Sequence, residues 1–102
     1  MRVLVVGAGG VGSAVARTAA RWDLFERVVM ADYDEERARR AIAGGGARFA
    51  AVKLDARDEQ AVAGLIRTER CDAVLNALDP RFVMPVFRAA LAAEVTYLDM
   101  AM

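Results

Sequence analysis

The chain has 102 residues, of which 57% are hydrophobic, and its 14 basic residues balance its 14 acidic residues. This length suits a single domain that buries roughly two-thirds of its unfolded surface. Zero net charge argues against nucleic acid and anionic membranes as partners, and the lack of histidine excludes His-based metal sites and Ser-His or Cys-His pairs. The single cysteine, Cys71, excludes an internal disulfide and predicts a reducing, cytoplasmic location.

The first predicted strand, at residues 2–6, leads directly into Gly-Ala-Gly-Gly-Val-Gly at residues 7–12, and a helical pattern follows. This is the G-x-G-x-x-G pattern in its strand-to-helix context. Gly7 permits a tight turn, Gly9 lets the backbone approach a pyrophosphate, and Gly12 lets the helix pack closely on the sheet. The anion would meet the free N–H groups at the start of the helix. The segment therefore predicts a dinucleotide site.

The predicted helix at residues 10–22 places Val11, Val15, Thr18 and Trp22 on one face. The second predicted strand, at residues 27–32, ends at Asp32, which follows Gly12 by 20 residues. A carboxylate at this position accepts hydrogen bonds from the two adenosine ribose hydroxyls and repels a 2′-phosphate. We therefore expect NAD to be preferred over NADP.

The next predicted helix spans residues 34–43 and begins with a cluster of acids. We interpret Asp34 as its N-cap and the two glutamates that follow as partners of the helix dipole. Three arginines of this helix could reach a phosphate, so some use of NADP stays possible: Arg37, Arg39 and Arg40.

Predicted strands at residues 48–54 and 72–76 each end beside a candidate cofactor contact. After the first, Asp55 could accept from the adenine amino group while the Ala56 N–H donates to the ring; a role for Asp55 in starting the predicted helix at residues 58–68 is equally compatible. After the second, the backbone of Asn76, Ala77 and Leu78 is expected beside the glycine loop, facing the pyrophosphate and the nicotinamide ribose.

The last predicted elements are a helix at residues 80–93, which Asp79 is expected to cap, and a strand at residues 95–99. Asp99 would lie at the ligand-binding edge, as a possible substrate contact, whereas Cys71 is expected to be a small buried side chain. No set of residues completes an acid–base or nucleophilic mechanism, so the catalytic residues stay unknown.

Strictly alternating strands and helices predict an α/β fold, a Rossmann-type doubly wound parallel sheet with strand order 3-2-1-4-5. The apolar end at residues 98–102 suggests a domain truncated after its fifth strand, so that residues 1–102 form an NAD(P)-binding domain and the substrate domain is absent. An unpaired edge strand beside the apolar Met100-Ala101-Met102 predicts a homo-oligomer.

Five segments, in this order, are more selective than the glycine loop alone: Val-Val-Gly-Ala-Gly-Gly-Val-Gly-Ser at 5–13, Ala-Asp-Tyr-Asp at 31–34, Leu-Asp-Ala at 54–56, Asn-Ala-Leu-Asp-Pro at 76–80 and Thr-Tyr-Leu-Asp at 96–99. Together they resemble the N-terminal domain of saccharopine dehydrogenase-like proteins. The resemblance implies nicotinamide-dependent hydride exchange at an amino-acid C–N bond. It implies that Asp32 holds the ribose, that Asp55 and Ala56 hold the adenine, and that the pyrophosphate is held by Gly7, Gly9, Gly10, Val11 and Gly12.

Two alternatives come from other classes of protein. Ubiquitin-activating and sulfur-carrier adenylyltransferases share the glycine loop and an Asp-x-Asp, but their Asn-Leu-x-Arg segment for ATP is replaced here by Glu-Glu-Arg-Ala-Arg-Arg. A non-catalytic regulatory domain would use the same fold to sense a nucleotide.

Overall fold

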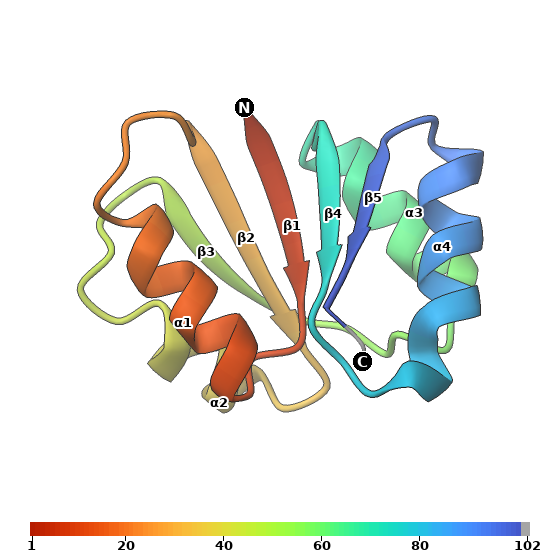
Figure 1. Cartoon of the computed structure of the whole chain (residues 1–102), viewed down its shortest axis with the longest axis horizontal. Helices are drawn as coiled ribbons and strands as arrows, with labels where there is room; N and C mark the ends of the chain where they lie inside the picture. The colour runs from red at the N-terminus through yellow and green to blue at the C-terminus, as the bar shows by residue number, and fades with distance from the viewer. Residues whose placement is uncertain (101–102) are drawn as a thin grey trace.

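A parallel sheet with helices on both faces forms the domain in the computed structural model, which describes residues 1–100 (Figure 1). Ala101 and Met102 of the predicted apolar tail lie outside the described residues. The strand order is β3-β2-β1-β4-β5, with each neighbouring pair parallel, so the predicted fold class and strand order are confirmed. The strands of the described region are β1 (Arg2–Val6), β2 (Arg27–Asp32), β3 (Phe49–Lys53), β4 (Ala73–Asn76) and β5 (Thr96–Asp99).

The helices divide between the two faces of the sheet. One face carries α1 (Gly10–Ala19) and α2 (Glu35–Ala41), and the other carries α3 (Glu59–Thr68) and α4 (Val83–Ala92), which follows a short 3₁₀ turn at Pro80–Phe82. Two predicted helices begin one residue late because Asp34 and Asp58 cap them from outside, each accepting from backbone N–H groups of the first turn. The last predicted helix begins at Val83 instead of residue 80 because Pro80–Phe82, which Asp79 caps as expected, forms a 3₁₀ turn.

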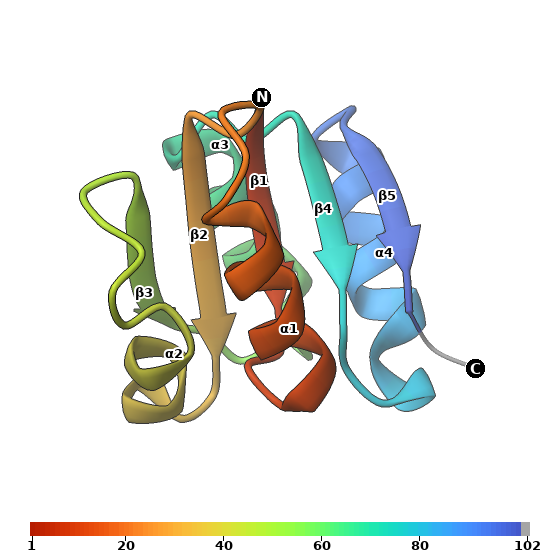
Figure 2. The same cartoon turned by 60° about the vertical axis from the view of Figure 1, so that its left-hand side comes forward.

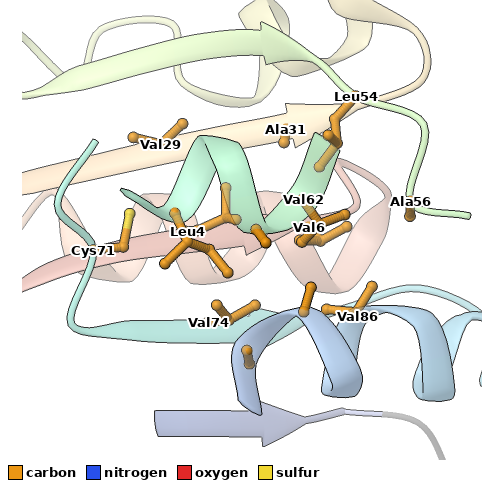
Figure 3. Packing of buried hydrophobic residues seen from close by; sticks show 14 residues of the cluster. Leu4, Val6, Val29, Ala31, Leu54, Ala56, Val62, Cys71, Val74 and Val86 are labelled. Carbon is orange, nitrogen blue, oxygen red and sulfur yellow. The ribbon is translucent and has the colours of Figure 1, made fainter. Parts of the chain in front are cut away.

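Alternate residues of β1 point into two separate cores. Leu4 and Val6 pack towards α3 and α4, in the cluster that Figure 3 shows around Val62, Val74 and Val86. Val3 and Val5 pack towards α1 and α2. Because the central strands are buried on both faces, they are almost continuously apolar, as expected for a parallel sheet.

The face of α1 that packs on the sheet consists of small residues, Gly12, Ala16 and Ala19. Val11 and Trp22 of the predicted apolar stripe are 46% and 55% exposed. Beside α1, the same face of β4 and β5 has no helix over it within residues 1–100 (Figure 2). The domain therefore shows an apolar surface where α1 meets this half of the sheet.

Candidate functional site

The glycine loop needs Gly7 and Gly12 for its own geometry. Gly7 has a positive φ of 105°, and a Cβ there would lie 2.8 Å from Leu78 Cδ2. A Cβ on Gly12 would lie 1.7 Å from the Gly7 carbonyl oxygen, which no side chain can accept. The sequence Gly-x-x-x-x-Gly thus lets β1 turn sharply and lets α1 start against that turn.

The middle of the loop is open instead of crowded. A Cβ added to Gly9 or Gly10 would meet nothing within 4 Å, and both residues are exposed. Gly9 is the N-cap of α1 and has no side chain to satisfy the helix N–H groups. This leaves first-turn N–H groups accessible to an anion, at the positive end of the helix dipole.

Asp32 ties the end of β2 to this loop. Its Oδ2 accepts a 2.8 Å hydrogen bond from the Ala8 N–H, and its Oδ1 accepts from the Asp34 N–H at 2.8 Å and from Arg37 Nη2 at 3.2 Å. The residue is 3% exposed. Burial alone would raise the pKa of Asp32, but these hydrogen bonds outweigh it and the pKa is lowered. The carboxylate is therefore ionised at neutral pH.

A pocket of about 310 Å³ opens beside Asp32, at the carboxyl ends of the strands. Four of the predicted cofactor contacts line it: Gly7, Asp32, Asp55 and Ala56. Its remaining lining comes from the adjoining chain segments: Val6, Tyr33, Arg37, Leu54, Arg57, Leu78 and Phe82. Apolar side chains next to two carboxylates and two guanidinium groups suit a nucleoside, whose base is flat and whose ribose carries hydroxyl donors.

Asp55 lines the pocket and also accepts hydrogen bonds within the turn before α3. Its Oδ1 accepts from the Arg57 N–H at 3.0 Å, and its Oδ2 lies 3.1 Å from Arg57 Nη2. The side-chain hydrogen bond from Arg57 is the main reason that the pKa of Asp55 is lowered. Both of the roles that the sequence left open for Asp55 are compatible with this position.

The Asn76 side chain is hydrogen-bonded within the protein. The residue is fully buried, and its Nδ2 donates to the Tyr97 hydroxyl at 3.1 Å while its Oδ1 accepts from the Leu78 N–H at 3.0 Å. Ala77 does lie against the loop, where its N–H donates to the Val6 carbonyl at 2.8 Å. The Asn76 carbonyl also accepts from the Met100 N–H at 2.9 Å, so the predicted contact of this backbone with a cofactor stays a prediction.

Asp99 joins the same hydrogen-bonded group at the end of β5. Its Oδ2 accepts from the Tyr97 hydroxyl at 2.8 Å. Burial is the main reason that the pKa of Tyr97 is raised. This group lies at the carboxyl end of β5, but it does not line the pocket beside Asp32.

A larger hollow of about 480 Å³ lies along the exposed side of α1. Gly10 and Val11 of the predicted pyrophosphate loop line it, together with Val15, Trp22 and Phe25. No charged side chain lines it within the described chain. A dinucleotide is polar and anionic, so the smaller pocket beside Asp32 fits it better despite its size.

Other candidate chemistry finds no support in residues 1–100. Cys71 is buried, as expected, and burial is the main reason that its pKa rises to about 11. In the same part of the chain, no group of three His, Cys, Asp or Glu residues could hold a metal ion, and no helix is long and apolar enough to cross a membrane.

The sequence did not predict Leu54, Arg57 and Phe82 as pocket residues, whereas Leu78 belongs to the segment that was expected beside the glycine loop. Leu54 and Arg57 adjoin the predicted contacts Asp55 and Ala56 in the chain, so this proximity was the available signal. Phe82 enters the pocket because the Pro80–Phe82 turn folds back towards it, with the Phe82 N–H donating to the Asp79 carbonyl at 3.0 Å.

Comparison with known proteins gives a family match over nearly the whole chain. Residues 3–102 match the family model described as the saccharopine dehydrogenase NADP binding domain.

Several solved structures share the fold. Apo saccharopine dehydrogenase (L-Glu forming) from Saccharomyces cerevisiae has a TM-score of 0.83 and 22% identity, over 96% of this chain and 21% of the yeast chain. Serine dehydrogenase from Escherichia coli has a TM-score of 0.77 and 16% identity, over 97% and 61%. UDP-glucose 4-epimerase from Thermus thermophilus, solved with NAD, has a TM-score of 0.72 and 20% identity, over 93% and 35%. This chain thus spans about a fifth of the yeast protein.

Proposed function

Because the chain belongs to the saccharopine dehydrogenase family through its NADP-binding domain, we propose that it holds NAD(H) for an oxidoreductase acting on an amino-acid C–N bond. One observation carries this proposal. The ionised Asp32 is hydrogen-bonded to the glycine loop at Ala8 and forms one wall of a nucleoside-sized pocket. The acid for a ribose and the loop for a pyrophosphate therefore lie next to each other, which is what one dinucleotide requires.

Each part of the site has a distinct task in this proposal. Asp32 accepts from the ribose hydroxyls, and Asp55 with the Ala56 N–H faces the adenine. The open backbone at Gly9, Gly10 and Val11 binds the pyrophosphate with the α1 N–H groups, while Gly7 and Gly12 keep the loop in shape. The backbone at Asn76 and Ala77 borders the nicotinamide half. When bound, the nicotinamide supplies or accepts the hydride.

We propose the amino-acid substrate and the catalytic groups for the whole parent enzyme and not for residues 1–102 alone. The described residues offer a cofactor site without a histidine, a metal cluster or a reactive thiol. We therefore propose that residues 1–102 bind cofactor but do not by themselves turn over an amine substrate.

Calorimetric titration of the purified chain with NAD, NADP and ATP tests the assignment. We expect NAD to bind more tightly than NADP, and ATP to bind weakly, since ATP lacks the second nucleoside. Asp32→Ala should weaken NAD binding by about tenfold, because two hydroxyl contacts to a charged acceptor are lost. Gly9→Val should abolish binding by filling the pyrophosphate path. Tight ATP binding with none for NAD would favour an adenylyltransferase instead.

We also propose that the chain self-associates and that it is located in the cytoplasm. Strand β5 lies at the edge of the sheet, and the apolar surface beside it includes Leu98, Val11 and Trp22, all exposed. A second copy of the chain would cover this surface and pair the edge. The buried free thiol of Cys71 suits a reducing, cytoplasmic compartment.

A further inference from the structure

We propose that the buried side chain of Asn76 couples the end of β5 to the pocket beside Asp32, so that Tyr97 sets the affinity for the adenosine half of a cofactor without touching it. The inference rests on the proposed function, because it assumes that this half lies in that pocket. Neither Asn76 nor Tyr97 lines the pocket, whereas Leu78 and Phe82 do. Asn76 and Tyr97 are therefore positioning residues, which act through hydrogen bonds that lead from β5 to the pocket.

The Asn76 amide makes three hydrogen bonds that reach three separate parts of the chain. Its Oδ1 accepts from the Leu78 N–H at 3.0 Å, and its Nδ2 donates to the Phe82 carbonyl at 3.4 Å and to the Tyr97 hydroxyl at 3.1 Å. Because the residue is fully buried, solvent does not replace a bond that is lost. The amide has one orientation, since a reversed amide would place its oxygen against the Phe82 carbonyl and its nitrogen against the Leu78 N–H.

Two of these partners form part of the pocket. The Leu78 side chain lies against the glycine loop, because a Cβ on Gly7 would be 2.8 Å from Leu78 Cδ2. Phe82 reaches the pocket from the 3₁₀ turn before α4. Asn76 is the last residue of β4, so its amide holds the segment between β4 and α4 at both ends. A nucleoside in the pocket would contact side chains whose positions Asn76 fixes.

Tyr97 provides the third bond from the neighbouring strand. Because Asn76 Nδ2 only donates, the Tyr97 hydroxyl accepts from it and gives its own proton to Asp99 Oδ2, at 2.8 Å. The Tyr97 ring packs edge-to-face on the ring of Phe87 in α4, with 5.4 Å between the ring centroids. Removal of the hydroxyl alone therefore frees one Asn76 donor and leaves the packing of the ring in place.

Loss of this hydroxyl should reach the pocket. Asn76 Nδ2 would retain only its longer bond, to the Phe82 carbonyl. A buried donor without a partner is costly, so the amide should turn or move towards that carbonyl, and the segment that carries Leu78 and Phe82 should move with it. By linkage, a ligand that favours the present position of this segment must favour the contact between Tyr97 and Asn76 equally.

Calorimetric titration with ADP-ribose measures the effect, because this ligand carries the adenosine half without the nicotinamide. We expect Tyr97→Phe to weaken binding by about fivefold, the size of one hydrogen bond, and Asn76→Leu by about tenfold, since all three bonds are lost. Thr96→Val removes an exposed hydroxyl from the same strand and should stay within about twofold of wild type. A purely structural role for Tyr97 would lower the urea midpoint and leave the dissociation constant of the folded chain unchanged.

The tyrosine signals provide a second readout, which needs no variant of the network. The sequence holds two tyrosines, of which Tyr33 lines the pocket and Tyr97 does not. In NMR spectra of a chain labelled with carbon-13 at the tyrosine Cζ atoms, ADP-ribose should shift the Tyr33 signal directly and the Tyr97 signal through Asn76. Tyr33→Phe assigns the two signals. At saturating ligand, Asn76→Leu should retain the shift of Tyr33 and lose that of Tyr97.

Several results would overturn the coupling while the proposed function stands. These are a Tyr97 signal that stays unshifted at saturation, a Tyr97→Phe chain that binds ADP-ribose as tightly as wild type, and equal weakening by Thr96→Val. If Tyr97→Phe fails to fold, the Tyr97 signal of the wild-type chain decides. If the wild-type chain does not bind ADP-ribose at all, the proposed function fails, and this coupling fails with it.

Discussion

Gly12 packs so closely on Gly7 that a Cβ atom at position 12 would lie 1.7 Å from the Gly7 carbonyl oxygen. Gly9, between them, has nothing within 4 Å of a Cβ position. The glycines of one motif therefore have separate tasks, one in folding and one in binding.

Substitution by alanine should separate these two tasks. Gly12→Ala should lower the free energy of unfolding by about 3 kcal/mol, because the helix must move away from the β1 turn. Gly9→Ala should stay within about 1 kcal/mol of wild type and yet weaken dinucleotide binding. Urea denaturation and calorimetry measure the two quantities. Gly64→Ala, in the middle of α3 with open space around it, is the control and should stabilise by about 0.5–1 kcal/mol. Equal losses of stability at positions 9 and 12 would contradict this division.

Asp32 should make the stability of the domain depend on acid pH. Its folded-state pKa lies below the ordinary value of 3.8, so its contribution is present above that value and is lost as the pH falls through the folded pKa. Asp32→Asn should cost about 2 kcal/mol at neutral pH and should flatten the acid side of the profile. Denaturant midpoints from neutral pH down to about pH 2 give the measurement, with Asp23→Asn at an exposed turn as control. Parallel profiles for Asp32→Asn and wild type would refute the role of these hydrogen bonds.

Arg48 ends α1 by binding its terminal carbonyl groups. Nη2 donates to the Ala19 and Ala20 carbonyls at 3.2 and 2.8 Å, and Nη1 donates to those of Trp22 and Phe25 at 2.7 and 2.6 Å. Arg48→Ala should therefore lower the unfolding free energy by about 2 kcal/mol, and Arg48→Lys should recover only part of it because an ammonium lacks the planar fork. Thermal unfolding checks this, with the exposed Arg21→Ala as control. An Arg48→Lys variant as stable as wild type would exclude the fork as the cause.

Two helices end on left-handed residues that are not glycine. Arg70 after α3 has a φ of 54° and Glu94 after α4 a φ of 59°. The next N–H in each case closes the helix end, Cys71 to the Ile66 carbonyl and Val95 to the Ala90 carbonyl. Arg70→Gly and Glu94→Gly should each stabilise the domain by about 0.5–1 kcal/mol in urea titrations. Glu94→Ala keeps the steric cost and should give no gain; if it stabilises equally, the strain argument fails.

The sequence predicted the strand order and the loop because these depend on local patterns, namely alternation of apolar runs and glycines at fixed spacing. It did not predict the contacts of Arg48, whose four acceptors lie 23 to 29 residues away. On α1, helical spacing fits both the valine stripe and the stripe of Gly12, Ala16 and Ala19. The structure buries the small residues, because close packing of a helix on a sheet needs them. Periodicity alone cannot choose between two such stripes.

In the candidate site, too, local patterns predict the positions of some residues, whereas contacts between distant parts of the chain determine others. The positions of Gly7, Asp32, Asp55 and Ala56 in one pocket follow from strands that end at one edge of the sheet. The direction of the Asn76 side chain depends instead on Tyr97, 21 residues further along the chain. Arg37 lines this pocket and also a hollow beside Ser13 and Arg17 of α1, which requires the packing of α2 against α1 that no short pattern encodes.

The apolar surface at α1 and β5 should make the chain self-associate. Leu98 on the edge strand is 56% exposed, and Trp22 is the sole tryptophan of the sequence. The mass from light scattering should therefore rise with concentration, and tryptophan emission should shift to the blue as a second copy covers Trp22. Leu98→Lys should return the chain to monomer, since a lysine on an edge strand opposes pairing. Leu91→Lys, at a leucine on α4 across the sheet that is 65% exposed, should not. A monomer at all concentrations, or equal effects of the two lysines, would show that this surface does not join two copies.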